Sequence, residues 1–116
     1  MITQLNIHPY PKKLWLIYGE PDSSVIHKFA SEADNYQDCY SLPEDDLGRT
    51  IRTKKGNVVI RFQSIPTDPA AIAHEAFHAA FNILDYIGMS LTDESEEAFA
   101  YLLDSVVSQI HNEINK

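Results

Sequence analysis

Two histidines and a glutamate in one short segment have the spacing of a metal site. The segment is His74-Glu75-Ala76-Phe77-His78. In a helix, residues four apart lie on one face and one turn from each other, so both imidazoles can reach the same metal ion. Glu75 can then lie beside the metal without binding it and take a proton from a metal-bound water. The spacing therefore predicts a zinc site with Zn²⁺ bound by His74 and His78, and Glu75 as its general base.

The segment lies within an apolar stretch that predicts a helix from Pro69 to about Ile87. Thr67 or Asp68 can cap this helix, proline suits its first position, and Gly88 ends it. Apolar residues cover nearly the whole circumference, which is typical of a buried helix. Burial of two imidazoles and a carboxylate without partners would cost several kcal/mol, whereas a metal ion satisfies the imidazoles. The context therefore favours a metal site over histidines packed in a core.

The third ligand of a catalytic zinc site is expected from the acidic run at residues 93–97. This run opens a second predicted helix, which Thr92 or Asp93 caps and which extends to about Asn112. The separation from the histidines allows one helix to finish and a second to return across it. Acidic residues in a first helical turn also complement the helix dipole without binding a metal. Helix periodicity alone slightly favours Glu96 over Glu97, because Glu96 projects onto the apolar stripe.

Residues 74–79 together with residues 95–103, which read Ser-Glu-Glu-Ala-Phe-Ala-Tyr-Leu-Leu, resemble small zincin-like metallopeptidases of phages and prophages. The resemblance covers about residues 67–110 and leaves the first half of the chain unmatched. It implies that Glu97 is the third ligand, and we rank Glu96 second and Glu94 third. Tyr101, one turn beyond Glu97, is a candidate to stabilise the oxyanion or to orient a ligand, although packing at the helix interface is its simpler role. Candidate hydrogen-bond acceptors for the ligand imidazoles are Asp85, Asp93 and Asp104.

The remaining pattern predicts an α+β fold, in which a short mixed or antiparallel sheet precedes two packed helices that carry the metal ligands. This is a small zincin-like domain spanning residues 1–116. Val58 to Ile65 is the candidate edge strand beside the metal, where a substrate peptide can add a strand. The other expected elements are a strand at Leu14 to Tyr18, a helix through Val25, Ile26, Phe29 and Ala30 capped by Asp22 or Ser23, a strand at Tyr36 to Leu42, and a hairpin of Thr50 to Thr53 with Val58 to Ile65 around Lys54-Lys55-Gly56-Asn57.

Composition narrows the possible partners. The net charge is −8, with 17 acidic against 9 basic residues, which disfavours nucleic acid. No apolar run approaches the roughly 20 residues that span a bilayer, and the first residues lack the features of a signal peptide, so a cytoplasmic protein is expected. Cys39 cannot form an internal disulfide and is expected to be a packed residue. The clustered basic residues are expected on a solvated hairpin face: Arg49, Arg52, Lys54, Lys55 and Arg61.

Three functions remain open on these residues. The first is a zinc metallopeptidase that acts on a peptide or protein substrate. The second is a non-catalytic, zinc-stabilised protein-interaction module of phage or prophage origin, which the small size favours but the carboxylate of Glu75 disfavours. The third is a metal-free helical interaction domain in which the motif is accidental. Substrate and oligomeric state do not follow from the sequence.

Overall fold

Four strands form one mixed sheet in the computed structural model, which describes residues 1–31 and 41–116. The sheet order is β1-β2-β4-β3. β1 and β2 are antiparallel, β2 and β4 are parallel, and β4 and β3 are antiparallel. The bounds are β1 Ile2–Leu5, β2 Leu14–Tyr18, β3 Gly48–Arg52 and β4 Val58–Phe62.

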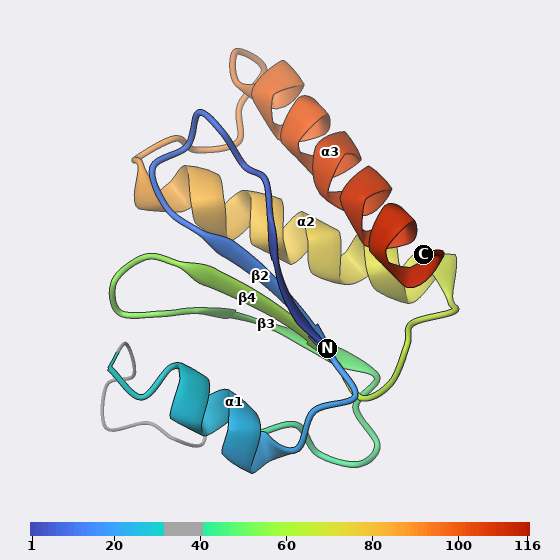
Figure 1. Cartoon of the computed structure of the whole chain (residues 1–116). Helices are drawn as coiled ribbons and strands as arrows, with labels where there is room; N and C mark the ends of the chain where they lie inside the picture. Colours follow the sequence, from blue (N-terminus) through green and yellow to red (C-terminus); the bar gives the residue numbers. More distant parts are fainter. Residues whose placement is uncertain (32–40) are drawn as a thin grey trace.

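The helices cover both faces of this sheet (Figure 1). α1, Asp22–Lys28, lies on one face, and α2, Pro69–Tyr86, and α3, Glu96–Ile114, lie together on the other. This arrangement confirms the predicted α+β class. Within the described ranges, no helix has the length and apolar character needed to cross a membrane.

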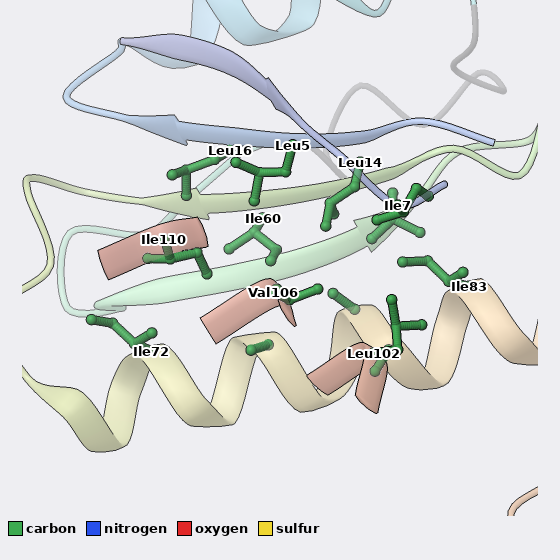
Figure 2. Close-up of a cluster of buried hydrophobic side chains, with 14 of the residues drawn as sticks. Leu5, Ile7, Leu14, Leu16, Ile60, Ile72, Ile83, Leu102, Val106 and Ile110 are labelled. Carbon is green, nitrogen blue, oxygen red and sulfur yellow. The ribbon is translucent and has the colours of Figure 1, made fainter. Parts of the chain in front are cut away.

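The main core lies between the sheet and the pair of long helices. Figure 2 shows Leu14, Leu16 and Ile60 of the sheet directed toward side chains of α2 and α3. On α3 the buried residues recur at helical spacing: Phe99, Leu102, Val106 and Ile110. The strands alternate, so the neighbouring residues Ile17 and Val59 face the smaller cluster under α1 instead. Burial of both faces explains why β4 consists of buried residues throughout.

Replacement of Ile60 by alanine is expected to lower the free energy of unfolding by about 2–5 kcal/mol. Ile60 is fully buried between the sheet and the helices, and alanine would leave a cavity there. Leu91 is about half exposed, so Leu91→Ala should change stability by no more than about 0.5 kcal/mol. Urea unfolding of both variants measures the difference. Equal losses would contradict the core assignment.

Most predicted elements are confirmed, with shifted ends. β2 and the hairpin of β3 and β4 are present, and Gly56 takes a positive φ of 88° in the turn. β4 ends at Phe62, earlier than predicted, because the chain then turns away toward α2. The expected strand at Tyr36 to Leu42 falls largely outside the described residues.

Four predictions about these elements are wrong. α1 begins at Asp22 after Pro21, so neither Asp22 nor Ser23 is its cap. β4 is an interior strand between β2 and β3, so the edge strand on this side is β3. α3 begins at Glu96, after a turn in which Ser95 Oγ accepts a hydrogen bond from the Thr92 amide at 2.9 Å. Arg61 is buried rather than solvated, because its guanidinium lies 2.6 Å from Asp22 and donates to the Glu20 carbonyl.

Candidate metal site

The two histidines of the motif lie side by side on α2. Their Nε2 atoms are 3.2 Å apart, and the rings meet edge to face. Two nitrogens bound tetrahedrally to one zinc ion, at about 2.0–2.1 Å each, lie about 3.3 Å from each other. The donor set and the separation of His74 and His78 therefore fit one zinc ion. The same separation also suits a hydrogen bond between the rings when one Nε2 carries a proton.

The histidines are exposed, and this contradicts the prediction of a helix buried all round. The side chain of His74 is 66% exposed, and His78 is exposed as well. The outward face of α2 also carries Phe77 and Phe81, each more than 40% exposed. The sheet and α3 cover only the opposite side of the helix. The cost of burying unpartnered imidazoles is therefore no argument for a metal here.

Glu75, in contrast, is buried and held by a residue of β3. Its side chain is 10% exposed. The hydroxyl of Thr50 lies 2.9 Å from Glu75 Oε1 and 3.1 Å from the main-chain oxygen of Glu75, so its single proton is shared between two acceptors. The other carboxylate oxygen, Oε2, lies 4.0 Å from His74 Nε2. Thr50 thus fixes one oxygen of Glu75 and leaves the other beside the histidine pair.

Thr50 is the residue of this site that the sequence reasoning missed. Alternate residues of a hairpin strand share one face, so Thr50 and Arg52 could have been placed together from the sequence. Which face lies against α2 depends on tertiary packing. Arg52 makes a similar contact with α2, because its guanidinium lies 2.8 Å from the carboxylate of Asp85. The two contacts join the edge strand to the helix that carries the motif.

Thr50→Val is expected to lower the free energy of unfolding by about 1–3 kcal/mol. Valine keeps the shape of threonine but leaves the buried carboxylate of Glu75 without this donor. Thr50→Ser retains a hydroxyl and should recover at least half of the loss. Thermal unfolding of the metal-free proteins measures both. Equal stability of the valine and serine variants would show that the hydrogen bond is not what holds Glu75.

The predicted third ligand is not brought to the histidines. Among residues 1–31 and 41–116, no group of three or more His, Cys, Asp or Glu side chains lies close enough to hold a metal ion. Glu96 and Glu97 are exposed in the first turn of α3, and Glu94 is exposed in the preceding turn. By helix geometry Glu97 lies on the side of α3 opposite its buried stripe.

The other candidates near the ligands also lie apart from the pair. Tyr101 is 72% exposed, so it is not packed at the helix interface as expected. Asp85 pairs with Arg52, and no contact among the described residues joins it to an imidazole. Asp93 and Asp104 are exposed. The residues that the fold does bring together are therefore His74, Glu75 and His78, with Thr50 behind them.

The edge strand presents main-chain groups beside this site. The Thr53 amide donates to the Asn57 carbonyl, and the Gln63 amide donates to the Leu47 carbonyl, so the odd-numbered residues of the hairpin bond across it. Main-chain groups of Gly48, Thr50 and Arg52 then point to the outer edge, where no described residue pairs with β3. Thr50 therefore contacts Glu75 through its side chain and offers its main chain to a further strand.

Comparison with protein-family models, with curated proteins and with solved structures gives no match.

Proposed function

We propose that the chain is a zinc-dependent hydrolase, most specifically a metallopeptidase, in which His74 and His78 provide two metal ligands. The observation that carries the proposal is the 3.2 Å separation of the two Nε2 atoms with the carboxylate of Glu75 held beside them by Thr50. A purely structural metal site has no use for an intervening carboxylate. A general base needs such a fixed position.

The roles of the residues follow from that arrangement. A zinc ion at this place would lower the pKa of a coordinated water to about 7 and polarise a substrate carbonyl. Glu75 takes a proton from the attacking water as a bond forms between the water oxygen and the carbonyl carbon. Glu75 then delivers this proton to the nitrogen as the carbon–nitrogen bond breaks. Thr50 is a positioning residue, because it acts through Glu75.

An extended peptide is the substrate that suits the neighbouring strand. The outward main-chain groups of β3 can bind a peptide as an added strand, and such hydrogen bonds require no particular side chains. Because Thr50 contacts Glu75, this edge lies next to the residue proposed as general base. A peptide paired with β3 would therefore pass the motif in an extended conformation.

Glu97 remains the proposed third ligand, on the resemblance of its surrounding residues. Because Glu97 is exposed and outside the histidine cluster, its carboxylate can bind only if the first turn of α3 approaches α2. Glu97→Ala is expected to weaken zinc binding at least about tenfold, whereas Glu94→Ala and Glu96→Ala should each change it less than about threefold. Competition with a chromophoric chelator measures these affinities. A larger effect of Glu96→Ala would transfer the role to that residue.

The proposal is tested with the zinc-loaded chain and a diverse peptide library, with cleavage followed by mass spectrometry. The expected result is cleavage that disappears when zinc is removed and returns when zinc is restored. Thr50→Val should retain zinc but cleave more slowly, and Thr50→Ser should restore much of the rate. Absence of cleavage over the whole library, with zinc bound, would contradict the hydrolase.

One observation favours a second function, a non-catalytic zinc-stabilised module that binds another protein. The described residues provide two histidines but no third donor, and an exposed pair of this kind can be completed by a partner. In that case zinc should bind weakly to the isolated chain, and Glu75→Gln should leave partner binding unchanged. Measurement of zinc affinity for the isolated chain separates this module from a three-ligand site.

A further inference from the structure

A mainly apolar pocket of about 110 Å³ lies where β4 leaves the sheet and α2 begins. Its apolar lining comes from three places in the chain: Leu47 before β3, Phe62 at the end of β4 with Ile65 and Pro66 after it, and Ala71 on α2. Leu47 and Ile65 are more than half exposed and stand at the rim, whereas Phe62 and Pro66 are buried. The pocket is therefore open to solvent but has an apolar floor.

The pocket continues the surface that carries the candidate metal site. Ala71 precedes Glu75 by four residues and His78 by seven, so the three lie along one side of α2. Four residues of helix correspond to about 6 Å. On β3, Gly48 lies against the ring of Phe62, which lines the pocket, and precedes Thr50 by two residues, or about 7 Å of strand. The pocket thus lies about two residues of extended chain away from the general base.

We infer that this pocket binds an aliphatic side chain of a peptide that pairs with the outer edge of β3. The inference rests on the proposed function, because it assigns the substrate of that site. Side chains of an extended peptide repeat on one face every two residues, which matches the step from Thr50 to Gly48. An apolar cavity of about 150 Å³ holds a benzene molecule. The side chains of valine, leucine and isoleucine are smaller than benzene, so a pocket of about 110 Å³ suits one of them.

The charges around the pocket support an uncharged occupant. Among the described lining residues, Asp68 is the one that carries charge. Its carboxylate caps α2 by accepting a hydrogen bond from the Ala70 amide at 2.9 Å, so it is already engaged. An acidic side chain would be repelled by Asp68, and a lysine would have to bury its ammonium among apolar groups. A leucine side chain carries no charge, so it is neither repelled by Asp68 nor penalised for burying a charge in the pocket.

The test is a titration of the metal-free protein with N-acetylated pentapeptide amides of sequence Gly-Gly-Xaa-Gly-Gly, followed through backbone amide signals by NMR. With leucine at the centre, the largest shifts are expected at residues 47–50, 64 and 71. The dissociation constant should be at least about fivefold lower with leucine than with lysine or aspartate. Equal binding of the three peptides, tighter binding of lysine, or shifts confined to other surfaces would overturn the assignment.

Two matched variants locate the binding. Ala71→Phe fills the pocket and should remove the preference for leucine, whereas Ala70→Phe, on the neighbouring exposed position, should retain it. Leu47→Asp at the exposed rim should weaken leucine binding at least about fivefold and is tolerated by the fold, since Leu47 is 67% exposed. A preference unchanged in both Ala71→Phe and Leu47→Asp would contradict the inference. The spectra themselves show whether each variant is folded.

Failure of this inference is distinguishable from failure of the hydrolase. If the leucine peptide binds at the pocket but the zinc-loaded protein cleaves nothing, the hydrolase proposal is contradicted and the aliphatic subsite is supported. If the protein cleaves peptides without any preference for an aliphatic residue near the scissile bond, and cleavage is unchanged in Ala71→Phe, the subsite is contradicted and the hydrolase proposal is supported. The first readout uses no zinc, so the two results are independent.

Discussion

Glu75→Gln is expected to reduce hydrolysis by a factor of about 10²–10⁴ while zinc binding stays unchanged. The amide has the shape of the carboxylate, and its oxygen can still accept the hydrogen bond from Thr50. It cannot take a proton from the attacking water. The measurements are kcat/KM for a peptide that the wild-type chain cleaves, zinc content by elemental analysis, and the melting temperature of the zinc-loaded variant.

A matched control for this substitution is Glu44→Gln, because Glu44 is exposed in the loop before β3. It makes the same change of charge away from the motif, and activity should stay within about twofold of wild type. Equal activity of wild type and Glu75→Gln would remove Glu75 from the mechanism. A loss of zinc from Glu75→Gln would instead indicate that the carboxylate binds the metal.

His74→Ala and His78→Ala are each expected to weaken zinc binding at least about a hundredfold. Each change removes one of the two nitrogen ligands that the fold places 3.2 Å apart. Both side chains are exposed, so the metal-free variants should differ from wild type by no more than about 0.5 kcal/mol in stability. Competition with a chromophoric chelator gives the affinities, and urea unfolding gives the stabilities.

His111→Ala is the control for these variants. His111 lies near the end of α3, outside the pair, and its loss should change zinc affinity less than about twofold. An affinity that falls equally in all three variants would show that zinc binds the chain without using the motif. An affinity unchanged in His74→Ala and His78→Ala would leave the 3.2 Å contact as a hydrogen bond between the rings.

The elements with strong local signals were predictable from the sequence. α2 begins at Pro69 after Asp68, whose side chain caps it, and Gly88 follows its end with a φ of 83°. These residues act through their own backbone geometry, so no knowledge of the rest of the fold is needed. The closeness of His74 and His78 was predictable for the same reason. Two side chains four residues apart on a helix lie close together wherever the helix lies in the fold.

Properties that depend on which surfaces meet were not predictable. The apolar residues of α2 suggested burial on all sides, yet α3 and the sheet cover one side and leave Phe77 and Phe81 exposed. The hairpin was recognised, but the pairing of β4 with β2 makes β3 the edge strand. The role of Thr50 depends on a further contact that the sequence does not show, the packing of α2 against the face of β3 that carries Thr50.

The residue at which α3 starts was also not predictable from the sequence. Thr92 and Asp93 were the predicted caps, but Ser95 also belongs to a residue type that caps helices, so local signals alone do not fix the start. In the structure Ser95 Oγ closes a turn with the Thr92 amide, and the helix starts at Glu96. This choice sets the direction of each following side chain, and it leaves Glu97 exposed and apart from the histidines.

Anomalous diffraction at the zinc absorption edge, from crystals grown with one equivalent of zinc, locates the bound zinc ion. We expect one peak about 2.0–2.1 Å from Nε2 of both His74 and His78. The same map identifies any carboxylate that completes the site. A zinc peak elsewhere on the chain, or no peak between these two nitrogens at full zinc loading, would contradict the claim that the motif is a metal site.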